Sequence, residues 1–464
     1  MSSELHYLSL DEVARRLKTR KVSSVEATGA LLDRIGRVDP ALKAYATVTP
    51  ERALADARAR DAETAAGKSR GVLHGVPIAV KDLCNTEGVP TAAGMAIHRA
   101  NVPAKDATVV ARLKAAGAVI LGKLQMTEGA FGAHHPSIPA PLNPWNATYW
   151  TGSSSSGSGA ATAAGLCFGS LGSDTGGSIR FPSTMNGLSG MKPTWGRVSR
   201  AGVFPLADSL DHVGPMARSA LDAAIMLGVI AGADPDDPTA VPLAVPDYAG
   251  TIGAGVRGKR IGLATNMDDL DSDSRRALDG AAAALRAAGA EVVDVVLPAS
   301  FAQGSRDWVP LCAVETALAH ERTYPARAAE YGPVLAALID MGRTLSAVDF
   351  ARLQARRAAL TGELSTLLAS VDLLLAPVMA RAAWSLETLA AAGRDPESVA
   401  GRLRYTAPFD LSGHPTLTLP GGMTTDGVPT GFQIVGRAFH EASILAAGHA
   451  YQQATDWHLR RPRL

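Results

Sequence analysis

The 464-residue sequence predicts an α/β fold, in which short strands alternate with helices. From about residue 72, the strand-like runs GVPIAVKD and AVILGK flank a helix-like segment at 108–117, which is the rhythm of βαβ units. The second half repeats this rhythm, because strand-like RIGLAT and EVVDVVLP enclose a helical pattern. Apolar residues make up 47% of the chain, which is enough for a large core.

The N-terminal part, about residues 1–68, is predicted to be helical. Residues 9–18 and 23–37 carry Leu, Val and Ile at helical spacing. Ser9, and Ser23 or the serine after it, are suitable starts for these two helices, because a serine side chain can accept a hydrogen bond from the first turn. We therefore expect the sheet to begin after this part.

A long surface connection is predicted over about residues 232–258, where prolines and glycines recur without a period. The α/β pattern then continues with a long helix at 346–370, the buried-strand run VDLLLAP, strand-like TLTLPGG and TGFQIVG, and a terminal helical pattern. Because both sides of the connection share one architecture, we expect a single domain over residues 1–464.

The charge balance argues against polyanionic partners. Lys and Arg number 45 and Asp and Glu 44, so the net charge is +1 and no long-range field attracts nucleic acid or an anionic membrane. The three cysteines, Cys84, Cys167 and Cys312, are far apart and odd in number, which indicates neither a disulfide framework nor a zinc site. No secretory pattern opens the sequence, and its apolar stretches are too short to span a membrane. We expect a cytoplasmic protein.

Residues 142–195 are dense in Gly, Ser, Thr, Asn and Pro, and include GSSSSGSGAA and GSDTGGSIRFP. Composition alone is typical of a flexible linker or an exposed loop. An apolar segment and a second Gly-rich turn follow the first piece at once, however. We therefore predict packed backbone in which glycines permit close approach.

The second Gly-rich turn supplies a candidate nucleophile. Hydrolysis of an amide near neutral pH needs an activated nucleophile, a group that stabilises the oxyanion, and a proton donor for the leaving nitrogen. The segment GSDTGGSIR places Ser178 directly after two glycines. The N–H groups of Thr175, Gly176, Gly177 and Ser178 can converge on one point there and form an oxyanion hole from backbone alone.

Lys81 is the candidate base, since these Gly/Ser-rich segments contain no histidine. It follows an apolar strand-like run, so its side chain is expected to leave the end of a buried strand. Burial disfavours the ammonium form and lowers the pKa of lysine, which allows the amine to accept a proton. The alternative is a solvated lysine, or one paired with the adjacent Asp82.

Three motifs in this order, GVPIAVKD, TGSSSSGSGAATAAG and GSDTGGSIRFP, closely resemble those of the amidase signature family. The resemblance is most specific over about residues 70–220 and weaker over the remainder. It implies a mixed central β-sheet flanked by helices on both faces. It also implies a hydrolase that cleaves C–N bonds with no metal and no organic cofactor.

The resemblance assigns roles residue by residue. Ser178 matches the nucleophile of the family, Lys81 matches the base, and Ser154 matches the serine that follows a cis peptide and relays the proton. This sequence has serines at 153 and 156 where the family commonly has glycines, so Ser155 is the alternative bridge. Asp174 and Arg180 are implied to support the nucleophile turn as an ion pair.

The substrate pocket is expected to be apolar. By resemblance, Met126, Phe131 and His134 lie in the segment that lines it, and Met95 stands where many relatives have a small polar residue. Trp150, Phe204 and Trp308 are further candidates for an apolar lining. His134 and its neighbour His135 diverge on an extended backbone, so no shared metal site is expected.

The resemblance leaves the substrate open among amides, anilides, carbamates (urethanes) and esters, and the chain is expected to be a monomer or a homodimer. One alternative is the glutaminase component of a glutamyl-tRNA amidotransferase, which hydrolyses glutamine for a partner. Another is a nucleotide-binding protein that uses residues 152–158 as a phosphate loop. That loop lacks the lysine that should follow its second glycine.

Overall fold

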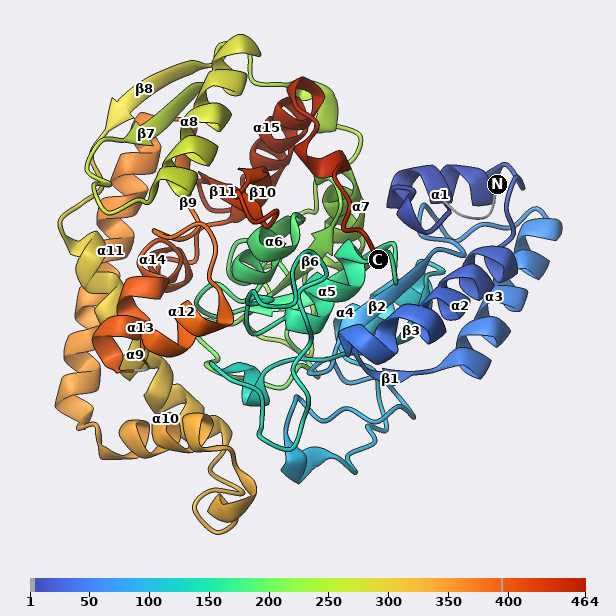
Figure 1. Cartoon of the computed structure of the whole chain (residues 1–464), viewed down its shortest axis with the longest axis horizontal. Helices are drawn as coiled ribbons and strands as arrows, with labels where there is room; N and C mark the ends of the chain where they lie inside the picture. Colours follow the sequence, from blue (N-terminus) through green and yellow to red (C-terminus); the bar gives the residue numbers. More distant parts are fainter. Residues whose placement is uncertain (1–4, 394) are drawn as a thin grey trace.

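The computed structural model describes residues 5–393 and 395–464 (Figure 1). At its centre is one eleven-stranded sheet with the order β1-β3-β2-β4-β6-β5-β10-β11-β9-β7-β8. Its strands are β1 (Tyr45–Val48), β2 (Pro77–Lys81), β3 (Val119–Leu124), β4 (Gly169–Asp174), β5 (Ser189–Lys192), β6 (His212–Ala217), β7 (Arg260–Ala264), β8 (Glu291–Val295), β9 (Leu373–Pro377), β10 (Thr416–Met423) and β11 (Pro429–Gly436).

The α-helices are α1 (Leu10–Lys18), α2 (Ser24–Leu42), α3 (Pro50–Ala65), α4 (Thr108–Ala115), α5 (Ser156–Ala163), α6 (Arg180–Asn186), α7 (Ala220–Ile230), α8 (Ser272–Ala287), α9 (Ser300–Ala319), α10 (Pro333–Thr344), α11 (Ala347–Ser370), α12 (Leu386–Ala391), α13 (Pro396–Leu403), α14 (Ala407–Leu411) and α15 (Glu441–Ala454). Single-turn 3₁₀ helices are η1 (Leu5–Tyr7), η2 (Ala96–His98), η3 (Glu128–Ala130), η4 (Ile252–Ala254), η5 (Ala328–Glu330) and η6 (Trp457–Leu459).

The sheet is mixed, and its parallel part positions the site. β2 pairs in parallel with β3 and β4, and β7 pairs in parallel with β8 and β9, whereas the strands between these groups are antiparallel. Because β2 and β4 are parallel neighbours, their carboxyl ends meet at the same edge of the sheet. Lys81 ends β2, and Asp174 ends β4 immediately before the Gly-Gly turn.

Helices cover both faces of the sheet. Successive strand residues point to opposite faces. Gly431 of β11 lies against Thr184 of α6, whereas the next residue, Phe432, packs edge-on against Tyr451 of α15 with ring centroids 4.8 Å apart. The predicted α/β fold with a flanked mixed sheet is therefore confirmed. Figure 1 also shows α9, α10, α11 and α13 grouped at the left, far from α1–α3.

The predicted helix starts are confirmed at two serines. The Ser9 side chain accepts a hydrogen bond from the Glu12 backbone, and Ser23 forms a reciprocal capping box with Glu26. The expected purely helical start is wrong in one place, because β1 at residues 45–48 adds an antiparallel edge strand beside β3. Within the described part of the chain, η4 is the one helix or strand between α7 and β7, as expected for a long connection.

The Gly/Ser-rich segment after residue 150 is packed, as predicted, and is not an exposed loop. A Cβ atom at Gly152 would lie 2.4 Å from Pro182, and one at Gly157 would lie 2.3 Å from the carbonyl oxygen of Ala44. These glycines therefore let α5 begin against neighbouring backbone. Across the described residues, none of the helices is both long and apolar enough to cross a membrane.

Candidate active site

Lys81 lies fully buried at the end of β2. Its Nζ donates to Ser154 Oγ at 2.6 Å and to Ser173 Oγ at 2.8 Å. Burial lowers the pKa of Lys81 to about 7, because the ammonium form loses its hydration inside the protein. A large fraction of this amine is therefore neutral near physiological pH and can accept a proton.

Asp82 is not the partner of Lys81, so that alternative is wrong. Its carboxylate accepts a hydrogen bond from the Ala92 N–H and lies 3.8 Å from Nζ of Lys123, another buried lysine. Lys123 also donates to the Thr91 hydroxyl. The two lysines at this edge thus have separate surroundings, and Lys81 has hydroxyl partners where Lys123 has a carboxylate nearby.

The structure distinguishes the two candidates for the bridging serine. Ser154 follows a cis peptide bond after Ser153, and its hydroxyl contacts Lys81. Ser155 turns away, because its Oγ hydrogen-bonds to the backbone carbonyl and N–H of Ser173, both at 3.2 Å. Of the two serines, Ser154 is therefore the one placed to exchange a proton with the lysine.

Asp174 organises the turn at residues 174–180, which is called the nucleophile turn because it contains the candidate nucleophile Ser178. One of its carboxylate oxygens accepts from the Gly177 N–H at 2.6 Å, and the other accepts from the Ile179 N–H at 2.9 Å. Arg180 binds both oxygens at 2.9–3.0 Å, which confirms the expected ion pair. Burial alone would raise the pKa of Asp174, but the charge and hydrogen bonds of Arg180 hold it far below the ordinary range.

This arrangement corrects the predicted oxyanion hole. The Gly177 N–H donates to Asp174, so it is used by the turn itself and not directed at a substrate. The backbone donors that remain are those of Thr175, Gly176 and Ser178, and all three residues line the cavity described below.

Two distant helices hold the same turn. Arg180 reaches Asp410 of α14 at 2.5 Å, and Thr406, just before α14, donates its hydroxyl to the Gly176 carbonyl at 2.6 Å. Trp308 of α9 donates its indole N–H to the Thr175 carbonyl at 2.7 Å. The backbone of the turn is therefore fixed from outside the motif that contains it.

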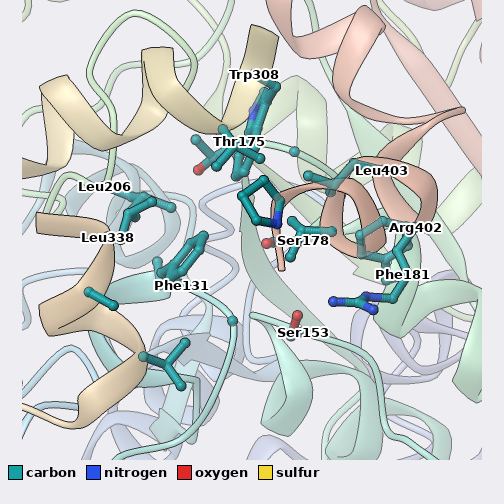
Figure 2. A pocket seen from close by; sticks show the side chains of 18 of the residues that line it. Phe131, Ser153, Thr175, Ser178, Phe181, Leu206, Trp308, Leu338, Arg402 and Leu403 are labelled. Atoms are coloured by element: carbon teal, nitrogen blue, oxygen red, sulfur yellow. The ribbon is translucent and has the colours of Figure 1, made fainter. Parts of the chain in front are cut away.

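A cavity of about 690 Å³ opens over the half-buried Ser178 (Figure 2). Its walls are mostly apolar and come from the η3 region, the ends of β4 and α5, and helices α6, α9, α10, α12 and α13. The lining residues are Ala130, Phe131, Gly132, Trp150, Ser153, Thr175, Gly176, Ser178, Phe181, Leu206, Trp308, Val309, Pro333, Val334, Ala337, Leu338, Met341, Leu386, Leu389, Ala390, Gly393, Pro396, Val399, Arg402 and Leu403.

Three of the predicted aromatic residues line this cavity. Phe131 and Trp308 lie with nearly parallel rings, at 18° and 6.5 Å between centroids, and Trp150 meets Phe181 at 5.7 Å. Phe204 does not line it. That side chain borders two smaller cavities instead.

The prediction that Met95, Met126 and His134 line the pocket is wrong. Met95 and Met126 are fully buried in the hydrophobic core, because they lie beside the tight approach of Gly94 to the 126–127 backbone. His134 instead hydrogen-bonds to Ser156 Oγ at 3.0 Å, and burial lowers its pKa to about 4. None of the three lines the cavity over Ser178.

Sequence reasoning missed most of the cavity wall. The residues from α10, α12 and α13 have the apolar spacing of ordinary core helices, so nothing in their pattern indicates a pocket. Ser173 could have been predicted as a hydrogen-bond partner of Lys81, because it lies in the GSDTGGS motif and belongs to a strand that neighbours the strand of Lys81.

Known proteins resemble this chain in sequence and in fold. The Amidase family model matches residues 26–445. The chain belongs to the amidase family. It is therefore a hydrolase that acts on amides, as the resemblance of its motifs implies.

Similar relatives cover nearly the whole chain. "Putative amidase AmiD" of Mycobacterium tuberculosis is 54% identical over 456 residues, which is 98% of this chain and 96% of that protein. A glutamyl-tRNA(Gln) amidotransferase component of Chloroflexus aurantiacus is 38% identical over 488 residues, covering 100% of this chain and 99% of that protein. The structure of the native peptide amidase from Stenotrophomonas maltophilia aligns with a TM-score of 0.82 at 31% identity and covers 98% of each chain.

Proposed function

We propose that this amidase forms an acyl-enzyme on Ser178, with Ser154 as the proton bridge and Lys81 as the base. The observation that carries the proposal is the hydrogen bond from the buried Lys81 amine to Ser154 Oγ at 2.6 Å, together with a lysine pKa of about 7. A neutral amine in contact with a hydroxyl can accept its proton, and that hydroxyl can then take a proton from a second serine.

The first half of the reaction forms the acyl-enzyme. Lys81 takes the Ser154 proton as Ser154 takes the Ser178 proton, and Ser178 Oγ bonds to the amide carbonyl carbon. The oxyanion accepts hydrogen bonds from the N–H groups of the turn. As the C–N bond breaks, the proton returns from the Lys81 ammonium through Ser154 to the leaving nitrogen, which departs as an amine.

The second half uses water in place of the amine. Water gives its proton to the same relay and attacks the acyl carbon, and the proton then returns to Ser178 as the acid leaves. Among the described residues, no hydrogen bond joins the Ser154 and Ser178 hydroxyls. The proposal therefore requires this contact to close when substrate is bound, as is common for catalytic hydrogen bonds.

The lining favours substrates with an apolar or aromatic body. Stacked and tilted aromatic pairs border the cavity, and its volume lies within the range of sites for small organic molecules. We therefore propose aryl amides or aryl carbamates as the substrate class. Both contain an acyl carbon bonded to nitrogen, so one relay serves both.

We further propose that the chain acts in the cytoplasm and without a partner protein. Its identity to a protein named as an amidase, 54%, exceeds its 38% identity to the amidotransferase component. Cys84, Cys167 and Cys312 are all buried and unbridged, which suits a reducing compartment. The Gly-rich turn considered as a phosphate loop is instead packed against protein backbone, so the nucleotide-binding alternative has no support.

The test is hydrolysis by the purified chain alone of an acyl anilide, an aryl carbamate and glutamine, beside its Ser178→Ala variant. We expect cleavage of the anilide or carbamate, reduced by about 10⁶ in the variant by analogy with other triad knockouts. Activity confined to glutamine would favour the amidotransferase alternative. Near-normal turnover by Ser178→Ala would contradict the assignment of the nucleophile.

A further inference from the structure

Among the described residues that line the apolar cavity over Ser178 is a charged side chain, that of Arg402. Of the described residues that line it, Arg402 alone is ionisable; the remainder are aliphatic, aromatic, glycine or hydroxyl residues. Ligand sites of this kind are mostly apolar, and the few polar groups among their walls fix the orientation of what binds. The position of Arg402 therefore bears on which molecules enter the cavity and how they lie there.

Helix α13 presents Arg402 on its cavity face. Pro396, Val399 and Leu403 occupy neighbouring positions on one side of the helix, and all three line the cavity with Arg402. Figure 2 shows the guanidinium beside Phe181, directed into the cavity toward the side where Ser153 and Ser178 lie. Arg402 Nη1 also donates to the Gly393 carbonyl at 3.1 Å, which holds the side chain at the wall between α12 and α13.

The chemistry of this group selects its ligand. A guanidinium stays charged at all physiological pH values and carries five N–H donors in a planar fork. This fork matches the two oxygens of a carboxylate. A carboxylate that reaches Arg402 gains charge-assisted hydrogen bonds, which a neutral amide of the same shape cannot form.

Accepting the amide hydrolysis proposed above, we propose that Arg402 forms an anion subsite, and that preferred substrates carry a carboxylate joined to the scissile amide by an apolar chain or ring. The apolar walls bind the spacer, and Arg402 fixes the far end. The subsite thus orients the scissile carbonyl on Ser178 and discriminates against neutral amides of the same length.

The test compares substrates that differ only in a carboxylate. On the acyl side, adipoyl para-nitroanilide is compared with hexanoyl para-nitroanilide; on the amine side, para-acetamidobenzoate is compared with acetanilide. For at least one pair we expect the carboxylate to raise kcat/KM, and Arg402→Met to lower kcat/KM for that substrate by about 10- to 100-fold while changing its neutral partner by less than about threefold. Arg402→Lys should retain part of the preference.

Arg306→Met is the matched control. Arg306 lies on α9 and contacts Glu397 of α13, the helix that also contains Arg402. It is half-exposed and does not line the cavity, so its loss should leave the preference for carboxylate substrates unchanged. Equal kcat/KM within both pairs in the wild type, or equal losses for charged and neutral substrates in Arg402→Met, would overturn the subsite.

Binding to Ser178→Ala, measured by calorimetry with the same pairs, separates this inference from the proposed mechanism. A carboxylate preference in binding without Ser178-dependent hydrolysis would contradict the mechanism and retain the subsite. Hydrolysis with no preference in binding or kcat/KM would retain the mechanism and overturn the subsite.

Discussion

The indole N–H of Trp308 donates to the carbonyl oxygen of Thr175 at 2.7 Å, across 133 residues of sequence. The same ring also lies on the cavity wall, and a Cβ atom at Gly176 would lie 2.6 Å from it. One side chain therefore contacts both the space that receives substrate and the backbone that would receive the oxyanion.

Trp308→Phe should lower kcat by about 3- to 10-fold, the usual cost of one neutral hydrogen bond, because the turn loses its anchor while the wall keeps a ring. Steady-state kinetics on an anilide would measure it. Phe131→Leu is the comparison, since Phe131 borders the same cavity without an anchoring bond to the turn, and it should change KM more than kcat. Equal effects on both parameters in the two variants would contradict the anchoring role.

The pH dependence should follow Lys81. Its pKa of about 7 means that the amine is charged below that pH and cannot accept a proton, so kcat/KM should fall by about tenfold per pH unit on the acid side and level off above pH 7. The profile is measured with a substrate that does not titrate in this range.

Ser173→Ala provides the control for that profile. Ser173 Oγ accepts from Nζ of Lys81 at 2.8 Å, and a lost acceptor disfavours the ammonium form. The midpoint of the profile should therefore move to lower pH. An unchanged midpoint would show that another group controls the titration.

Ser154→Ala should lower kcat by about 10²- to 10⁴-fold, the range for loss of positioned proton transfer, without affecting folding. Ser155→Ala should leave the relay intact and lower the melting temperature, since the Ser155 hydroxyl contacts the Ser173 backbone. Steady-state kinetics and thermal unfolding of both variants would measure these effects. A large loss of kcat in Ser155→Ala and not in Ser154→Ala would assign the bridging role to Ser155.

Arg180→Met should destabilise the fold by about 3–5 kcal/mol, because it leaves Asp174 and Asp410 as buried carboxylates without their shared cation. Urea unfolding would measure the loss. Arg352→Met, which breaks an exposed pair with Asp349, should cost less than about 1 kcal/mol. A loss of similar size in both variants would contradict the structural role of the buried network.

The sequence predicted the parts of the site that depend on short, contiguous backbone. Lys81 and Ser178 are positioned by a parallel strand pair and by the turn that follows one of its strands, and both features are visible as local patterns. Even there, the direction of a single N–H could not be predicted. The N–H of Gly177 donates to Asp174, and this follows only from the folded conformation of the turn.

The cavity wall was much less predictable. Met95 and Met126 have suitable side chains but face the core, because apolar character does not indicate which side of a turn is open. Leu403 and Arg402 come from a helix more than two hundred residues after Ser178, and their place in the cavity over Ser178 depends on tertiary packing. The edge strand β1 was not predicted for a similar reason, since its pairing with β3 is a long-range contact.

The origin of the cavity wall separates two kinds of change that evolution or a protein engineer can make. The proposed bond-breaking groups lie between residues 81 and 178, whereas α10, α12 and α13, which form much of the wall, lie beyond residue 330. Exchange of these three helices with those of a relative can therefore change which substrates the enzyme accepts while the proposed reacting groups stay unchanged. Such a chimera has to keep Trp308, Thr406 and Asp410, which lie outside the three helices, because each hydrogen-bonds to the turn at residues 174–180.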